Sequence, residues 1–367
     1  MKLVFSKNDL TKAVGIVSKA VPVRTTMPIL SCILIDASTN DIKFTANDME
    51  LGIETTVQGE IIEKGKIAID AKIFSEIVRK LPDNDITIAT DENFTATITC
   101  ENSKFNIAGK SGEDFSYLPV IEKDKQITVS QFTLRETINQ TIFSTAPNDN
   151  NKLMTGELFE VNENILKVVA LDGHRIAIRN IEITNSIDNL KVIVPGKTLV
   201  ELSKIFSTNA DDMVNIYFTT NHILFEFDNT IVVSRLIEGE YFKVNQMLSN
   251  DYDTKISINK KEFLDSIDRA SLLIRDNDKK PIIINITDGQ LEVKVNSAIG
   301  SLNENMPVEK DGKDIMIGFN PKFLIDALRV IDDEQINIHL VNPKAPCFIK
   351  DINESYIYLI LPVNFNA

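Results

Sequence analysis

The chain has 367 residues, too many for one ordinary hydrophobic core, and this length favours two or three domains. Hydrophobic residues make up 43% and charged residues 25%, which is typical of a globular protein. The net charge of −14 argues against nucleic-acid binding if it is spread evenly, because an acidic surface repels phosphate. The sequence has neither a secretory signal at its N-terminus nor an apolar run of the length of a membrane helix. We therefore expect a cytoplasmic protein.

The cysteines argue against a disulfide or zinc framework. Cys32, Cys100 and Cys347 are odd in number, far apart, and each lies inside an apolar run. This pattern is typical of buried, reduced thiols. We expect no metal and no cofactor.

Three segments have apolar residues at helical spacing, and they begin successive thirds of the chain. They span 6–20, 130–144 and 259–273. In the first, Leu10, Val14 and Val17 share one face. This repetition predicts three copies of one structural unit.

A second helix is predicted in each copy, directly after a short alternating strand. These strand–helix segments span 67–81, 192–206 and 317–331. One lysine has the same place in each of them, 125 residues apart, as Lys72, Lys197 and Lys322.

Alternating strands broken by turn residues follow each second helix, at 85–109, 212–236 and 334–362. Alternation with period two predicts antiparallel hairpins. The sequence therefore predicts three α+β domains, at residues 1–124, 125–252 and 253–367.

Positive charge gathers in the predicted helices. These segments are net basic, although the whole chain carries −14. If the helices share a surface, that surface could hold a polyanion while the rest of the protein repels it. Alternatively, the basic residues only solubilise exposed helices. No zinc-finger spacing or basic-region heptad is present, so any contact with duplex DNA is expected to be independent of base sequence.

Eight short segments follow one another along the chain: RTTMPIL (24–30), GKSGEDFSYLP (109–119), ALDGHRIA (170–177), VIVPGK (192–197), SRLIEGEYF (234–242), RASLL (269–273), IGFNP (317–321) and LPVNF (361–365). In these segments the whole chain resembles the bacterial DNA polymerase III beta subunit family, the sliding clamps. This resemblance implies a head-to-tail homodimer that forms a ring, with helices lining the hole and sheets outside. It implies a non-catalytic processivity factor for DNA replication.

The resemblance also implies residues that contact double-stranded DNA. These are Arg24, Asn148, Lys197, Asn320 and Phe323, to which the repeat adds Lys72 and Lys322. A turn-capping role for Arg24 and a solvated helix start for Lys197 remain the alternatives. Phe105, Leu272 and Leu273 match the apolar part of the family's dimer interface, and burial within one domain is the alternative for them.

The segment LDGHRIA (171–177) is expected to form one wall of a pocket for partner peptides. Aligned with ANDMELGI (46–53), it pairs Asp172 with Asp48, which indicates a shared turn residue, whereas Gly173, His174 and Arg175 are particular to the middle copy. This predicts one pocket per chain. The pocket residues implied by the resemblance are Met154, Leu171, Gly173, His174, Arg175, Ile176, Phe242, Met247, Leu359, Leu361, Pro362 and Val363.

Partners implied by the resemblance are the DNA polymerase III alpha subunit, the clamp loader, other DNA polymerases, and mismatch-repair or ligase proteins. The chain departs from the family pattern at Leu171, where Thr is usual, at Phe242, where Pro is common, and at Asn364, where Arg often stands. We therefore expect a more apolar pocket, with an altered motif preference.

Two alternative functions compete with this interpretation. An enzyme is disfavoured because PGKT (195–198) lacks the first glycine of a phosphate loop, and His174 has no nucleophile motif nearby. The acidic clusters at 211–212 and 332–334 follow helices and are interpreted as solvated turns. A variant copy of the clamp, for instance one that confers resistance to an inhibitor, remains an alternative.

Overall fold

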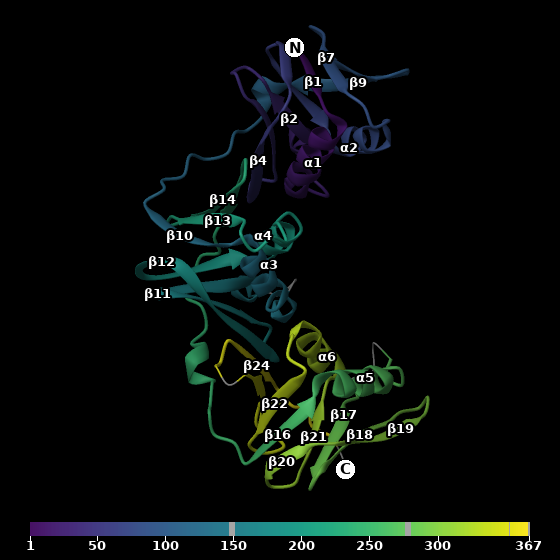
Figure 1. Ribbon diagram of the computed structural model, residues 1–367, viewed down its shortest axis with the longest axis vertical. Coiled ribbons are helices and arrows are strands. Elements are labelled where there is room, and N and C mark those ends of the chain that lie inside the picture. Colours follow the sequence, from purple (N-terminus) through teal and green to yellow (C-terminus); the bar gives the residue numbers. More distant parts are fainter. Residues whose placement is uncertain (147–150, 276–279, 352, 366–367) are drawn as a thin grey trace. The chain divides into compact units, whose positions relative to one another are not determined.

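The computed structural model describes residues 1–146, 151–275, 280–351 and 353–365. The chain forms two compact units. The first unit contains Met1–Phe132 and Lys204–Leu236, and the second contains Thr133–Ser203 and Ile237–Ala367. Each unit is described by itself below (Figure 1).

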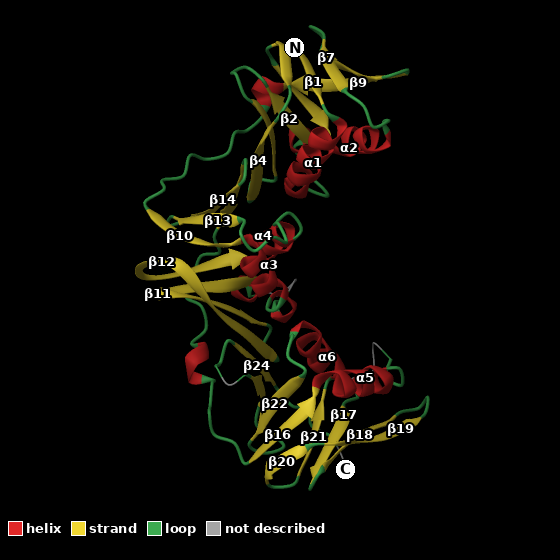
Figure 2. Ribbon diagram, in the orientation of Figure 1, coloured by secondary structure: helices red, strands yellow, loops and turns green. Residues whose placement is uncertain are grey.

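In the first unit, the helices α1 and α2 pack on one side of the strands (Figure 2). The Ser6 hydroxyl caps α1 by accepting a hydrogen bond from the Asp9 amide at 3.1 Å, and Asp70 caps α2 through the Ile73 amide at 3.0 Å. The elements of the first copy of the repeat are β1 (Lys2–Phe5), α1 (Lys7–Val17), β2 (Cys32–Asp36), β3 (Ile42–Asn47), β4 (Leu51–Val57), β5 (Glu60–Glu63), β6 (Lys66–Asp70), α2 (Ala71–Lys80), β7 (Ile86–Thr90), β8 (Thr95–Cys100) and β9 (Ser103–Ser111).

The first unit also takes strands from the second copy of the repeat. These are β10 (Lys125–Ser130), β13 (Met213–Phe218), β14 (His222–Phe227) and β15 (Thr230–Arg235). Among the described residues, one sheet has the order β10-β13-β14-β15-β4-β3-β2-β6-β9-β8-β7-β1-β5. The two copies are joined where β15 pairs antiparallel with β4, with Thr230 opposite Thr55. We call this pairing and the residues packed on it the first junction.

The second unit holds the rest of the second copy and all of the third. Its elements are α3 (Gln131–Asn139), β11 (Gly156–Leu171), β12 (Arg175–Pro195), α4 (Gly196–Ser203), β16 (Thr254–Asn259), α5 (Lys260–Ser271), β17 (Ile282–Thr287), β18 (Gln290–Asn296), β19 (Ser301–Pro307), β20 (Glu309–Gly312), β21 (Ile315–Phe319), α6 (Pro321–Val330), β22 (Gln335–Leu340), β23 (Cys347–Lys350) and β24 (Tyr356–Ile360); α3 begins two residues before the unit does.

The second unit is built on two sheets, with orders β11-β12-β24-β23-β22-β16-β20 and β19-β18-β17-β21 among the described residues. Helices α5 and α6 lie side by side against these strands (Figure 1). The second and third copies are joined where β12 pairs antiparallel with β24, with Arg179 opposite Tyr356. We call this pairing and its packed residues the second junction.

Short 3₁₀ turns complete the described secondary structure. They are η1 (Ser18–Ala20), η2 (Pro28–Ser31), η3 (Gly112–Asp114), η4 (Ile142–Ser144), η5 (Lys152–Thr155) and η6 (Val244–Gln246). None of the helices in the described part of the chain could span a membrane.

The predicted repeat of helices and antiparallel strands is confirmed. In each copy the second helix follows a strand directly, as β6 leads into α2, β12 into α4 and β21 into α6. The three cysteines are buried and free, as expected. The domain boundaries at 124 and 252 stay a prediction, since the two compact units divide the middle copy between them.

Candidate binding sites

The LDGHRIA segment forms the tight turn between β11 and β12 in the second unit. The Asp172 carboxylate accepts hydrogen bonds from the amides of His174 at 3.0 Å and Arg175 at 3.1 Å. Gly173 has a φ of 84°, in the left-handed region that glycine adopts without strain. Asp172 therefore fixes the backbone of this turn.

The counterpart turn between β3 and β4 has the same geometry. There the Asp48 carboxylate accepts from the amides of Glu50 at 3.0 Å and Leu51 at 2.7 Å. Met49 has a φ of 76° and takes the place of Gly173. The shared turn role predicted for Asp48 and Asp172 is confirmed.

Arg175 is directed into the protein. Its side chain is only 7% exposed, with Nε donating to Asp172 Oδ2 at 2.9 Å and Nη1 to Asp326 Oδ2 at 2.6 Å. Nη2 donates to the Phe143 carbonyl at 2.5 Å, and the guanidinium lies over the rings of Phe143 and Phe323. The guanidinium is thus satisfied by this chain, and Arg175 supports the turn from behind.

His174 is exposed and joins three segments. Its ring stacks on Phe323 of α6 with centroids 5.9 Å apart. Its carbonyl accepts a hydrogen bond from the Leu361 amide at 2.9 Å, which ties the β11–β12 turn to the C-terminal segment. The fold therefore brings His174 beside Phe323 and Leu361, which are far apart in sequence.

An apolar cluster lies beside this turn in the second unit. Of the predicted pocket residues, Leu171, Ile176 and Leu359 are buried in it, and Met154 and Phe242 are partly buried against it. Sequence reasoning missed other members, although the alternation of apolar residues along β11 and β12 was a usable signal for several. These are Leu153, Leu158, Val169, Ile178, Ile193, Ile237, Leu248, Phe348 and Ile357. Tyr241 and Val244 complete the cluster. We call all the buried and partly buried residues of this cluster the docking cluster.

Four other predicted pocket residues, Met247, Leu361, Pro362 and Val363, are not part of the docking cluster. Met247 is 48% exposed and Leu361 36% exposed, so both leave apolar surface uncovered. Pro362 and Val363 are half-buried, and the Val363 amide donates to the Gly318 carbonyl at 2.8 Å. The C-terminal segment is thereby held against the end of β21.

The arrangement suits binding and not catalysis. The Asp172 carboxylate is used by its own turn and by Arg175, and the hydrogen bonds of His174 described here come from its backbone. Within the described ranges no group of three or more His, Cys, Asp or Glu side chains is placed to hold a metal ion. What the site offers is an apolar surface with a half-exposed rim, the kind of surface that receives side-chain anchors of a peptide.

The three repeated lysines all lie at the second residue of their helices. Lys72, Lys197 and Lys322 are exposed at the starts of α2, α4 and α6. A cation is disfavoured there by the helix dipole, whose N-terminal end is positive. A lysine repeated at this place is therefore not explained by helix stability, and it leaves positive charge beside helix N-termini that attract anions.

The other residues predicted to contact DNA differ in their exposure and in their contacts within the chain. Arg24 is exposed, in the segment between η1 and η2. Asn320 caps α6, its side-chain oxygen accepting from the Lys322 amide at 3.0 Å. Phe323 lies against His174 and Arg175, which places it at the edge of the turn described above. Asn148 lies outside the described residues.

The apolar residues assigned to a dimer interface differ in exposure. Leu272, at the end of α5, is 78% exposed, and Phe105 on β9 is 39% exposed. Leu273 packs partly buried against the core of the third copy. Burial within one domain therefore does not account for Leu272 or Phe105.

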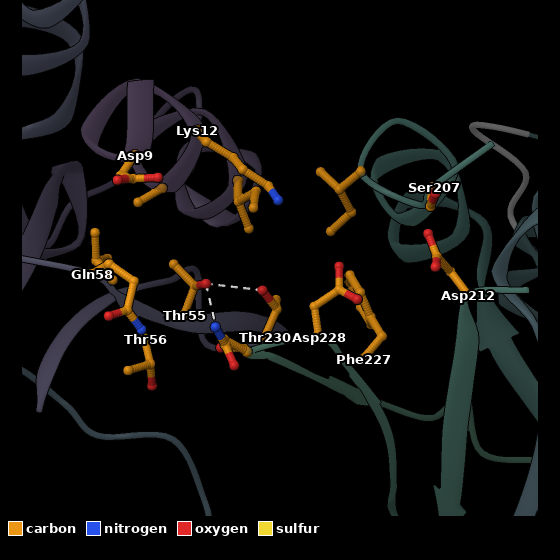
Figure 3. A pocket seen from close by; sticks show the side chains of 15 residues that line it. Asp9, Lys12, Thr55, Thr56, Gln58, Ser207, Asp212, Phe227, Asp228 and Thr230 are labelled. Atoms are coloured by element: carbon orange, nitrogen blue, oxygen red, sulfur yellow. Dashed lines mark hydrogen bonds between the residues drawn. The ribbon is translucent and has the colours of Figure 1, made fainter. Parts of the chain in front are cut away.

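A cavity of about 330 Å³ opens at the first junction, and no sequence pattern predicted it (Figure 3). Its lining comes from α1, β4, the 227–230 turn and residues 205–212. Lys12 extends toward it from α1, and the hydroxyls of Thr55 and Thr230 are 2.9 Å apart at its floor. Most of the lining is polar, including Asp9, Asp212 and Asp228.

Comparison with known proteins covers nearly the whole chain. Residues 1–119, 128–243 and 245–364 match the models of the N-terminal, central and C-terminal domains of the DNA polymerase III beta subunit. A beta sliding clamp of Staphylococcus aureus is 35% identical over 356 residues, 94% of each chain.

Solved structures agree with this match. A DNA polymerase III beta subunit from Eubacterium rectale is 69% identical with a TM-score of 0.96, and the DNA polymerase sliding clamp of Bacillus subtilis is 33% identical with a TM-score of 0.96. Both similarities cover 100% of each chain.

Proposed function

Because the chain belongs to the DNA polymerase III beta subunit family, the sliding clamps, we propose that it encircles duplex DNA as a ring-shaped homodimer. In this role it tethers the replicative polymerase and has no chemistry of its own. The observation that carries the proposal is the match of all three domain models in order along one chain. A cytoplasmic location follows from that role.

The contacts with DNA are proposed to be weak and independent of base sequence. Lys72, Lys197 and Lys322 supply positive charge at equivalent places in the three copies, in a chain whose net charge is −14. Topological closure would hold such a ring on DNA, so each phosphate contact can stay weak enough to allow sliding. Arg24, Asn320, Phe323 and Asn148 are proposed to add further contacts.

Loading and release from DNA test the ring. The protein is loaded by a clamp loader with ATP onto nicked circular DNA, and the circle is then cut once. We expect the protein to leave the linear DNA within minutes and to stay when both new ends are blocked by bound protein. Retention on linear DNA with free ends would contradict encirclement.

The docking cluster with His174 is proposed to receive a short apolar motif of the polymerase alpha subunit, the clamp loader, other polymerases and repair or ligase proteins. Its support is the half-exposed apolar rim of Met247 and Leu361 beside the cluster. Replacement of the usual Thr and Pro by Leu171 and Phe242 makes the surface more apolar.

A fluorescent peptide from the polymerase alpha subunit tests this site. We expect His174→Ala, or deletion of the last five residues, to weaken the peptide several-fold without dissolving the dimer. His222→Ala, a histidine change in the first unit, is the matched control and should leave affinity unchanged. Equal affinity of the His174→Ala and control proteins would remove the β11–β12 turn from the site.

A further inference from the structure

A separate cavity of about 250 Å³ adjoins the docking cluster in the second unit. Four of its lining residues, Leu158, Val169, Phe242 and Val244, belong to the docking cluster or pack against it. The cavity is therefore continuous with the apolar surface proposed to hold peptides.

One face of the β11–β12 pair changes character along its length. Side chains two residues apart in a strand share a face, so Leu171, Val169 and Lys167 lie on one side of β11. Lys191 and Ile193 are two residues apart in β12 and so also share a face. They lie opposite Glu160 and Leu158 of β11, respectively. This face is apolar at Leu171, Val169 and Ile193, and basic at Lys167 and Lys191, which line the cavity.

Positive charge exceeds negative charge around this cavity. Lys191 pairs with Glu160 at 2.7 Å, and Lys243 is exposed at the rim. The Lys167 ammonium donates to the neutral amide oxygen of Asn245 at 2.7 Å. Burial lowers the pKa of Lys167; Glu160 opposes this shift and Lys191 adds to it. An added carboxylate would relieve the repulsion between Lys167 and Lys191.

We propose that this cavity takes an acidic side chain of the docked peptide, next to the apolar anchor held by the docking cluster. The inference rests on the proposed peptide-docking function and adds a specificity rule to it. The cavity is smaller than sites for drug-sized ligands and is open to the apolar surface, which suits one side chain of a longer ligand. Lys167 and Lys191 then select carboxylate over neutral side chains of equal length.

The test uses pairs of fluorescent peptides that share the apolar motif of the polymerase alpha subunit peptide and differ only in one flanking residue, Glu or Gln, placed in turn at each flanking position. With the full-length protein, we expect the Glu peptide of at least one pair to bind about three- to tenfold tighter than its Gln partner, as expected for one or two partly exposed ion pairs. The preference should shrink at about 1 M salt, where the Debye length is about 3 Å.

Variants assign the preference to the cavity. The double variant Lys167→Gln/Lys191→Gln should bind the Glu and Gln peptides with equal affinity. Its affinity for the Gln peptide should equal that of the unchanged protein, and this equality would show that the site is still folded. Lys294→Gln is the matched control, because Lys294, like Lys191, lies in a strand and forms an ion pair with a glutamate, Glu292, at 2.6 Å. This variant should keep the preference for the Glu peptide.

Two results overturn the inference: equal binding of Glu and Gln peptides by the unchanged protein, or a preference that survives in the double variant. Failure of every anchored peptide to bind would instead contradict the proposed docking function.

Discussion

At the first junction, Thr55 of β4 lies opposite Thr230 of β15, whereas at the second junction the corresponding pair is Arg179 of β12 and Tyr356 of β24. The small pair leaves a cavity of about 330 Å³ beside α1. The large pair has partners: the Arg179 guanidinium lies 5.8 Å from the centre of the Tyr356 ring, and the Tyr356 hydroxyl donates to Asp333 at 2.7 Å.

The difference continues in the next layer. The next pair on the same face as Thr55 and Thr230 is Ile53 and Val232, and its counterpart is Ala177 and Tyr358. The Tyr358 hydroxyl donates to the Gln140 carbonyl at 3.0 Å. One pattern of strand pairing thus supports a junction with open space and a junction filled by aromatic rings, and backbone pairing alone does not decide how firmly two copies are joined.

The largest effect is expected from emptying the second junction. Tyr358→Ala removes a ring that is 2% exposed and should lower the free energy of unfolding by about 3–5 kcal/mol. Val232→Ala, at the counterpart place, should lower it by about 2 kcal/mol because fewer buried atoms are lost. Calorimetric melting of both variants measures the contrast. Equal losses of unfolding free energy would show that side-chain packing stabilises the two junctions to the same extent.

A second contrast concerns Glu157 of β11, whose counterpart in the first copy is Ile33; both side chains are fully buried. Burial raises the pKa of Glu157 to about 8, and the nearby Thr141 hydroxyl opposes this shift. From the ordinary carboxyl pKa of 4.5 up to about 8, the unfolded chain loses this proton while the folded protein keeps it. Folding stability then falls with rising pH, by up to about 1.4 kcal/mol per pH unit.

Glu157→Gln removes this dependence. We expect the variant to melt like the unchanged protein near pH 5 and then to become the more stable of the two, by about 1 kcal/mol at pH 6 and about 3–4 kcal/mol at pH 8. Melting temperatures of both proteins across this range provide the measurement. A constant difference at all pH values would mean that Glu157 is not the titrating group.

A smaller effect is expected from the hydroxyl pair at the first junction. Thr55→Val leaves the buried Thr230 hydroxyl without its 2.9 Å partner and should lower the free energy of unfolding by about 1–2 kcal/mol. The double variant Thr55→Val/Thr230→Val removes both hydroxyls and should be nearly neutral. Additive losses in denaturant titrations would show that the two hydroxyls do not stabilise each other.

The smallest effect separates the two matching turns. Gly173→Ala should lower the free energy of unfolding by about 1 kcal/mol through its left-handed φ alone, because an added Cβ meets no atom within 4 Å. Met49→Gly should have little net effect, since relief of the left-handed strain is offset by a more flexible unfolded chain. A loss above about 2 kcal/mol for Met49→Gly would show that its side chain stabilises the turn through contacts.

The sequence predicted features that depend on local spacing. The helix periods, the strand-to-helix steps at Lys72, Lys197 and Lys322, and the shared turn of Asp48 and Asp172 are all decided within a few residues. The acidic residues after α6 were predicted to be solvated, and they are exposed, but Asp333 also accepts the Tyr356 hydroxyl.

Features that depend on contacts between distant segments were not predictable. The inward direction of Arg175 is decided by Asp326 and Phe143, which lie 151 and 32 residues away. The cavity at the first junction depends on which β15 residue faces Thr55, and strand register is not encoded locally. The buried Glu157 looks in the sequence like an ordinary strand residue, and only packing reveals that water does not reach it.

The pairing of β4 with β15 has a consequence for synthesis on the ribosome. Thr55 and Thr230, which contact each other across it, are 175 residues apart in the chain. At about 5–20 residues per second, β4 emerges roughly 10–35 seconds before its partner strand exists. During that interval its backbone edge is exposed to other nascent chains, and Glu54 and Thr56, polar residues on the strand, are the features that discourage premature pairing.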